Sequence, residues 1–307
     1  MTMATMSATT VLYCADPLNG RRTDPHFAEE ARALRAQGAT VALVDHDALL
    51  AGDADGAVAR VPAGAGGVRY RGWMVPAARY AELDEALRRR GAVLLVSPDA
   101  YRRAHEFPGW YETFAALTPA GVWLPTVPGE VPDDRRLAAL AAALPPGAAV
   151  VKDYVKSRKH EWHEACHIPD LADPVALRRV VSRFVELQGE FLAGGLVLRA
   201  FEDFVVPEGA AAEVRVWWRD GEPRLFTAHP DSPVPEAAVI PAQDLEPVRA
   251  AVRALGCPFV TTDLALRTDG AWRVVEVGDG QVSDVHREVD PALFTALLTD
   301  DQPTAVV

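Results

Sequence analysis

Two Asp-Gly dipeptides constrain the fold of this 307-residue chain more than any other feature of its sequence. The first, at residues 220–221, divides the run AEVRVWWRDGEPRLFTAH, and the second, at residues 269–270, divides FVTTDLALRTDGAWRVVEV. Asp-Gly between runs of β-branched and aromatic residues is a strong signal for a tight β-hairpin. We expect a helix, EPVRAAVRALG, between the hairpins and a second one, capped by Asp173, ahead of them. This half of the chain is therefore predicted to be α+β with antiparallel sheets.

The second hairpin sets two carboxylates opposite each other. A two-residue turn at Asp269 and Gly270 pairs Asp263 directly with Glu276. Like charges at paired positions repel, unless a divalent cation lies between them or both face water. Asp279 follows just past the expected strand end, within reach of the same ion. The hairpin thus predicts a metal site, and the alternative is a solvated hairpin whose acids face water.

Cationic side chains accompany these acids. In the first hairpin, Glu213, Arg215 and Trp217 alternate onto one strand face. The fork of Arg215 suits a phosphate or carboxylate ligand, although an exposed face with an ion pair is the alternative. Lys152 and Lys156, in VVKDYVKS, follow an apolar strand and offer point charges to phosphate oxygens, unless they are solvated loop residues.

The first third of the chain alternates strand and helix, which predicts a parallel sheet with helices on its faces. The expected strands are VLYCA, TVALVD, GVRYRGWMV and AVLLVS, and the expected helices are FAEEARALRAQG and AARYAELDEALRRRG. Ligands of such sheets lie at the carboxyl ends of strands, here the loops at residues 16–26 and 97–111. The Pro- and Gly-rich segment TPAGVWLPTVPGEVPDD has no helical period and is interpreted as a crossing between domains.

Charge and apolar patterning exclude several classes of partner. A net charge of -12 argues against a nucleic-acid backbone or an anionic membrane as the ligand. No apolar run reaches the length of a membrane span, and MTMATMSATT lacks the features of a signal peptide. Three widely spaced cysteines indicate reduced thiols, so a cytoplasmic location is expected.

The run HEACH, residues 163–167, has the letter pattern of zinc peptidases, and Glu186 or Glu190 could supply a third ligand. Pro169 ends any helix close to the second histidine, and the preceding KSRKHEW is charged where a core helix needs an apolar face. A peptidase is therefore disfavoured. Incidental zinc binding is a second alternative, by His160, His163, Cys166 and His167.

Taken in order, VVKDYVKS, LVLRAFEDF, EVRVWW, TTDLAL and RVVEVGDGQ resemble the ATP-grasp superfamily over roughly residues 125–290. YRGWM, SPDAYRRAHEFPGWY and VKDYVKSRKHEW resemble, more narrowly, the clade named for one arginine and two lysines. The resemblance implies an α/β pre-ATP-grasp domain with a parallel sheet, residues 1–125. It further implies an α+β ATP-grasp domain of two lobes with antiparallel sheets, residues 126–300, and a flexible tail at residues 301–307.

The resemblance also implies roles for individual residues. Those expected to bind ATP are Lys152, Lys156, Arg199, Glu202, Asp203, Phe204 and Glu213, with Glu202 to Phe204 as the hinge that meets adenine. Those expected to act in catalysis are Arg215, Lys156 and Arg199. Asp263, Glu276 and Asp279 would hold Mg²⁺, with two ions expected. Where the superfamily has Asn, this chain has Gly278, so Asp279 or Gln281 is expected to replace it.

The implied activity is an ATP-dependent carboxylate–amine ligase acting through an acyl phosphate on a small molecule or peptide. A kinase of the same fold and a catalytically idle ATP-binding partner protein are the alternatives, and a homodimer is a possible assembly. HEACH is then interpreted as a mobile loop or short helix over ATP. Candidate substrate contacts are Arg71, Trp73, His105, Trp110, Tyr111, His163, Glu164 and Arg215, although Trp73 and Trp110 could equally be interface core.

Overall fold

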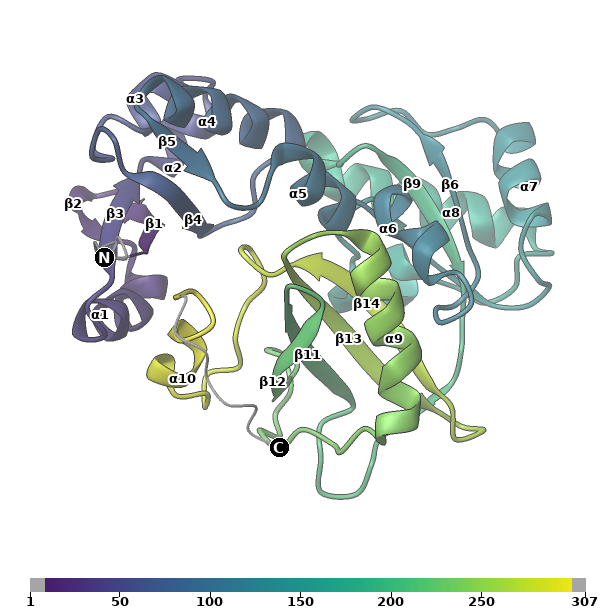
Figure 1. Ribbon diagram of the computed structural model, residues 1–307. Coiled ribbons are helices and arrows are strands. Elements are labelled where there is room, and N and C mark those ends of the chain that lie inside the picture. The colour runs from purple at the N-terminus through teal and green to yellow at the C-terminus, as the bar shows by residue number, and fades with distance from the viewer. Residues whose placement is uncertain (1–8, 300–307) are drawn as a thin grey trace.

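The computed structural model describes residues 9–299, which form three β-sheets with helices packed on them (Figure 1). The first sheet has four parallel strands in the order β3-β1-β4-β5, and β2 pairs antiparallel with the end of β1. Its strands are β1 (Thr10–Asp16), β2 (Asn19–Thr23), β3 (Thr40–Val44), β4 (Gly66–Arg71) and β5 (Ala92–Leu94). The predicted parallel sheet is therefore confirmed, and β2 is an addition within the loop expected after the first strand.

The helices around this sheet follow the expected alternation with the strands. They are α1 (Ala28–Ala36), α2 (His46–Leu50), α3 (Ala54–Ala57), α4 (Ala77–Arg89), α5 (Pro98–His105) and α6 (Phe107–Phe114), with a 3-10 turn at Pro25–Phe27. Ser97 caps α5 by accepting a hydrogen bond from the backbone N–H of Ala100. This start positions α5 directly after β5, with its C-terminal His105 buried.

The second sheet is antiparallel in the order β6-β9-β7-β8. Its elements are β6 (Gly121–Pro125), α7 (Asp134–Ala142), β7 (Ala149–Asp153), a 3-10 turn (Lys159–Glu161), a π-helix (Trp162–Cys166), β8 (His167–Ile168), α8 (Pro174–Gln188), a 3-10 turn (Gly189–Phe191) and β9 (Gly195–Ala200). Asp173 caps α8 as predicted, accepting hydrogen bonds from the next turn's backbone. The segment interpreted only as a crossing contributes β6, an edge strand paired with β9 and ending at Pro125. Edge strands tolerate proline, so the Pro-rich composition of this segment did not exclude a strand but made one hard to predict.

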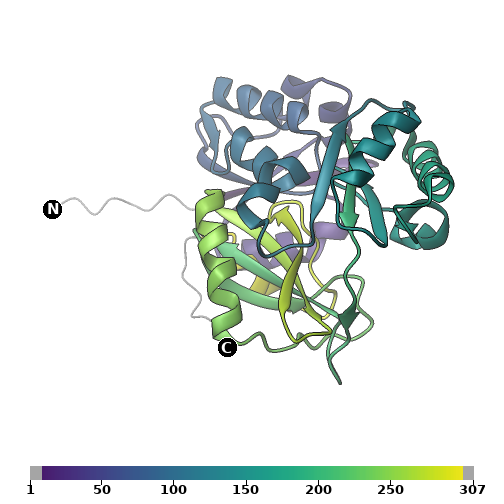
Figure 2. The same cartoon turned by 90° about the vertical axis from the view of Figure 1, so that its right-hand side faces the viewer.

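The third sheet is also antiparallel, in the order β12-β11-β13-β14, with β10 added at the end of β13. Its elements are β10 (Phe204–Val205), β11 (Glu213–Arg219), β12 (Glu222–Ala228), α9 (Ala242–Leu255), β13 (Phe259–Arg267) and β14 (Trp272–Asp279), followed by α10 (Pro291–Thr295). Helix α9 runs along one face of this sheet (Figure 2), and α10 packs against α1 of the first sheet (Figure 1).

The first hairpin has the predicted turn. Asp220 and Gly221 have φ values of 52° and 77°, the positive pair that a type I′ turn requires, and Arg219 pairs with Glu222. A bulge at Trp217 and Trp218 then shifts the register by one residue along the rest of the hairpin.

The second hairpin reaches the predicted pairing by a different route. The Arg267 backbone N–H donates to the Ala271 carbonyl at 2.8 Å, so the connection is longer than two residues, and the Arg267 side chain donates to the Asp269 carboxylate. A bulge between Asp263 and Leu264 corrects the register, and Asp263 does pair with Glu276. The pairing is confirmed, while the prediction of a two-residue turn is wrong.

Two hydrophobic cores hold these layers together. One joins the first sheet to the third, and the other lies in the second sheet beneath α7 and α8. Among residues 9–299, no helix combines the length and apolar character that crossing a bilayer requires.

Candidate functional site

A cavity of about 430 Å³, here called the central cavity, receives residues from all three sheets. Met74 follows β4, Lys156 follows β7, and Asp263 lies on β13. The predicted site residues that line it are His105, Lys156, Arg215, Asp263, Glu276 and Asp279. These predicted site residues therefore lie together at one cavity, and their roles stay predictions.

Arg215 and Asp263 form a buried ion pair in the wall of the cavity. They are register partners on β11 and β13, and the guanidinium donates from Nε and Nη2 to the two carboxylate oxygens, each at 2.8 Å. Nη1 donates to the carbonyl of Asp284, also at 2.8 Å. This bidentate arrangement fixes the guanidinium plane and leaves N–H groups for a ligand.

Glu276 has a cation of its own. Lys152, buried on β7, donates to Glu276 Oε1 at 2.8 Å. Burial by itself would raise the pKa of Glu276, but the charge and hydrogen bond of Lys152, with Arg199 and Arg215, lower it to about 2. Glu276 is therefore an ionised carboxylate at neutral pH. It is the register partner of Asp263 on the adjacent strand. Two carboxylates on adjacent strands fit the oxygen preference of Mg²⁺.

Lys156 is exposed at the cavity on a turn that Asp153 builds. Oδ1 of Asp153 accepts the backbone N–H groups of Val155 and Lys156, at 2.7 and 2.5 Å. Oδ2 accepts Gln188 Nε2 at 2.6 Å and the Ala193 N–H at 3.1 Å. The sequence interpretation missed Asp153, although Asp at the start of a short loop is a known signal for such a turn.

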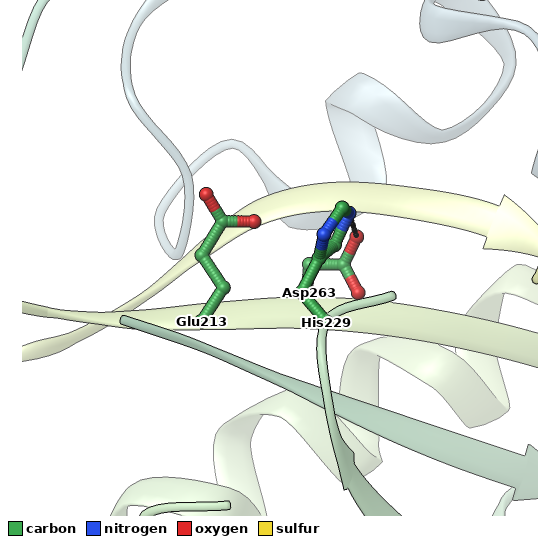
Figure 3. A group of neighbouring side chains, drawn as sticks. All are labelled: Glu213, His229 and Asp263. Carbon is green, nitrogen blue, oxygen red and sulfur yellow. Dashed lines mark ion pairs between the residues drawn. The ribbon is translucent and has the colours of Figure 1, made fainter. Parts of the chain in front are cut away.

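Glu213 and His229 meet Asp263 on one side of the third sheet (Figure 3). One potential ligand atom from each of the three residues lies within 4.8 Å of the others. Burial, then the charge of Asp263, raises the pKa of Glu213 to about 7, and burial lowers the pKa of His229. His229 escaped the sequence interpretation, although it directly follows β12 and its N–H bonds the Glu213 carbonyl at 3.1 Å.

The structure corrects the prediction for Asp279. Strand β14 continues to this residue, and because side chains alternate along a strand, Asp279 faces away from Glu276. Its fully buried carboxylate accepts the N–H and Nε2 of Gln281, at 2.9 and 3.0 Å, and contacts the Cys257 thiol. Burial raises the pKa of Asp279 to about 7. Although Asp279 belongs to the lining of the central cavity, these bonds and the strand alternation turn its carboxylate from Glu276, which argues against a shared ion.

The space beside Gly278 is taken by two hydroxyls. Thr261 and Ser283 hydrogen-bond each other at 2.7 Å, and a Cβ at residue 278 would lie 3.0 and 3.2 Å from their oxygens. Gln281 bonds Asp279 and Tyr80 instead. Neither residue expected to replace the superfamily's Asn is directed to that place.

Arg199 and the expected adenine hinge lie outside the lining of the cavity. Arg199 is buried behind β14, where it donates to the Val275 carbonyl and, at 2.7 Å, to Thr118 Oγ1. Burial lowers the pKa of Arg199 to about 10. Glu202 pairs with Arg267 and Arg273, while Asp203 is exposed and Phe204 begins β10. Their contact with ATP stays a prediction.

The aromatic candidates for substrate, and Arg71 with them, mostly build interfaces. Arg71 is buried and holds both oxygens of Glu30, at 2.8 and 2.7 Å, so it is not free to clamp a substrate carboxylate. Trp73 donates to Asp24 and faces a second cavity, while Trp110 is buried in the core. Tyr111 accepts a hydrogen bond from the Gly121 N–H. Only His105 of this set lines the central cavity, and burial lowers its pKa to about 4, so it is neutral near pH 7.

HEACH forms a short helix, as preferred, but not a metal-binding one. The π-helix ends at Cys166, and His167 is extended on β8, where it stacks on Trp162. Glu164 pairs with Arg183 on α8, and neither it nor His163 lines the central cavity. Among the residues described, the only metal-capable cluster is Glu213, His229 and Asp263, so the peptidase site and the four-residue zinc cluster are not assembled.

An antiparallel lobe carrying lysines, set against an antiparallel lobe carrying paired carboxylates, defines the class of ATP-grasp proteins. Within this class, residues 140–297 match the model of the ATP-grasp domain of family 3 in the clade named for one arginine and two lysines. The chain belongs to this family.

Solved structures share the fold at low identity. D-cycloserine synthetase DcsG is 18% identical with a TM-score of 0.59, over 95% of this chain and 98% of that one. D-alanyl-alanine synthetase A from Vibrio cholerae is 10% identical with a TM-score of 0.58, over 95% and 98%. ATP-grasp ligase PsnB, complexed with minimal precursor, Mg and ADP, is 15% identical with a TM-score of 0.55, over 95% and 97%. No curated protein sequence matches the chain.

Proposed function

We propose that this protein is an ATP-dependent carboxylate–amine ligase that activates its carboxylate substrate as an acyl phosphate. One observation carries the proposal: the Arg215–Asp263 pair and Glu276, which Lys152 holds from behind, share a cavity with the exposed Lys156. A lysine-bearing edge facing paired carboxylates suits a polyphosphate with its counterion. Membership of the ATP-grasp family supports the same assignment.

Asp263 and Glu276 are the residues that would hold Mg²⁺, because both are carboxylates on adjacent strands at the cavity. The ion would supply neutralisation of phosphate charge. Two ions are expected from the family resemblance, and the second would need ligands other than Asp279, which faces away.

The chain's own side chains fit the two chemical steps. Lys156 and Lys152 would hold phosphate oxygens while the substrate carboxylate attacks the γ-phosphorus and ADP leaves. Arg215, held by Asp263 and the Asp284 carbonyl, would donate its remaining N–H groups to the transferring phosphoryl group. The amine nitrogen then attacks the acyl carbon, loses a proton and expels phosphate. Closure of the lobes would exclude the water that hydrolyses an acyl phosphate.

The substrates are proposed as a small-molecule or peptide carboxylate and an amine. D-cycloserine synthetase exemplifies a small-molecule product among the structural neighbours, and PsnB has been solved with a precursor peptide. Nucleic acid and membrane are not proposed as partners. A cytoplasmic location, a homodimer and a domain boundary at residues 125–126 stay predictions.

The test is ATP turnover with Mg²⁺ over a panel of carboxylates and amines, with ADP, AMP and phosphate followed separately. ADP formation that requires both substrates supports the ligase, whereas ADP formation with one substrate alone identifies a kinase. Absence of turnover across the panel, with ATP still bound, would favour an idle module.

Glu276→Gln and Asp263→Asn are expected to lower turnover by at least about 100-fold, since each removes a carboxylate charge that is proposed to hold the Mg²⁺ counterion of the phosphates. Glu246→Gln is the matched control, because Glu246 is exposed on α9 and pairs with Arg249. Turnover that survives in both site variants would refute the site assignment.

A further inference from the structure

Glu213, His229 and Asp263 come from three neighbouring positions of the third sheet. Glu213 begins β11, His229 directly follows β12, and Asp263 lies on β13 as the partner of Arg215. Because Arg215 is two residues from Glu213, both project from the same face as Asp263. Figure 3 shows the three side chains on that side of the sheet. The cluster is therefore positioned by the pairing of strands and not by a flexible loop.

The carboxylate of Glu213 lacks a partner. Among residues 9–299 it makes no hydrogen bond or ion pair, although it is partly buried beside Asp263. Nε2 of His229 lies 3.8 Å from Asp263 Oδ2, which is too long for a hydrogen bond. Metal–ligand bonds of about 2.0–2.2 Å place the ligand atoms of one ion about 3–4 Å apart, so small rotations would close this site.

The surrounding charges leave room for a cation. Arg215 is matched by Asp263, and Lys159 by Asp231, with which it forms an ion pair. Among residues 9–299, Glu213 therefore has no ion-pair partner of its own to balance its ionised form. A divalent ion bound to Glu213 and the free lone pairs of Asp263 would do so without displacing Arg215, since each carboxylate oxygen can take two partners.

Asp231 is placed to orient the imidazole. Its backbone N–H donates a hydrogen bond to His229 Nδ1 at 3.2 Å, and its carboxylate Oδ2 lies 3.9 Å from the same nitrogen. A metal at Nε2 requires the proton on Nδ1, and metal-ligating histidines usually donate that proton to a carboxylate or carbonyl. Metal binding would therefore exchange the bond from the Asp231 N–H for a bond from Nδ1–H to the Asp231 carboxylate, which here pairs with Lys159.

We infer that Glu213, His229 and Asp263 bind a divalent transition-metal ion of the Mn²⁺ to Zn²⁺ kind. Imidazole suits these ions, while Mg²⁺ and Ca²⁺ prefer all-oxygen ligands, so the histidine sets this site apart from the Asp263–Glu276 pair. The two sites share Asp263 only. Binding at the new site needs neither ATP nor the ligase reaction.

The experiment is a Mn²⁺ titration of the nucleotide-free, full-length protein in excess Mg²⁺, followed by the electron paramagnetic resonance signal of free Mn²⁺. One Mn²⁺ per chain is expected to bind and to be displaced by Zn²⁺. His229→Gln and Glu213→Gln should each weaken binding by about 10- to 100-fold, and Asp231→Asn by about 10-fold. Glu276→Gln and the control Glu246→Gln should leave binding unchanged.

Other outcomes would overturn the inference. These are no Mn²⁺ binding by the wild-type protein, binding that survives both His229→Gln and Glu213→Gln, or binding lost in Glu276→Gln alone. Circular dichroism of each variant identifies a loss of binding that comes from unfolding, and the two separate ligand variants keep the test valid if one of them fails to fold.

Discussion

At the residue scale, two opposed carboxylates are stable because each has a cation of its own. The Asp263 carboxylate accepts two hydrogen bonds from the Arg215 guanidinium, and Glu276 accepts one from Lys152. The electrostatic repulsion expected between the two register partners is therefore offset at both of them. Against the effect of burial, the charge and hydrogen bond of Lys152 also lower the pKa of Glu276 to about 2. Asp279 has different surroundings, because its buried carboxylate accepts hydrogen bonds from neutral donors only.

This difference predicts a pH dependence for Asp279→Asn. The pKa of Asp279 is about 7 in the folded protein and ordinarily 3.8, so between these values the folded state binds more protons than the unfolded state. Folding stability from this group is therefore lost as pH rises from about 4 to 7. Asn has no such cost, and the variant is expected to exceed the wild type in stability by up to a few kcal/mol at pH 8, on the order of 1.4 per pKa unit.

Urea unfolding at pH 5 and pH 8 measures the difference in free energy of unfolding between the variant and the wild type. This gap should be larger at pH 8. Because Asp279 faces away from Glu276, the variant should also retain Mg²⁺-dependent turnover. A gap that does not change with pH, or turnover lost as in Glu276→Gln, would contradict the placement of Asp279.

At the element scale, the turn after β7 depends on a single buried acid. Asp153 accepts hydrogen bonds from three backbone N–H groups and from Gln188, and it holds the turn that presents Lys156. Asp153→Ala is expected to destabilise the fold by about 2–4 kcal/mol, because it leaves several buried donors unsatisfied.

The same change should raise the KM for ATP more than tenfold, since the Lys156 turn loses its anchor. Gln188→Ala is the matched control, because it removes one of these bonds and leaves the turn's own bonds in place. Unchanged ATP affinity in a folded Asp153→Ala protein would show that the turn does not position Lys156.

The elements also show what the sequence could and could not predict. The Asp-Gly signals and alternating residues identified both hairpins, and Asp263 opposite Glu276 followed from them. The connection is longer than predicted, and a bulge between Asp263 and Leu264 restores the predicted pairing of Asp263 with Glu276. No local sequence pattern reveals that these two irregularities cancel. Asp279 was misplaced because the strand was assumed to end before it. His229 was missed because its neighbours in space come from the other strands of the sheet, which only tertiary structure brings together.

At the scale of the whole molecule, Arg71 ties the first sheet to the third. It pairs with Glu30 on α1 and donates to the carbonyls of Gln281 and Ser283, after β14. Arg71→Met is expected to destabilise the protein by about 3–5 kcal/mol, because it leaves the partly buried Glu30 carboxylate without its charged partner.

Thermal unfolding of Arg71→Met and of the double variant Arg71→Met/Glu30→Gln tests this role, since the second change should restore part of the loss. If Arg71 instead binds substrate, the single variant would keep its stability and lose turnover, which is the outcome that contradicts a structural role.

The most direct test of the central claim follows oxygen atoms. With a heavy-oxygen label in the carboxylate of whichever substrate supports ADP formation, one labelled oxygen should appear in the released phosphate. Transfer of that oxygen requires the carboxylate to have been bonded to the γ-phosphorus, as an acyl phosphate demands. Phosphate that carries no label, or release of AMP in place of ADP, would contradict the proposed ligase mechanism.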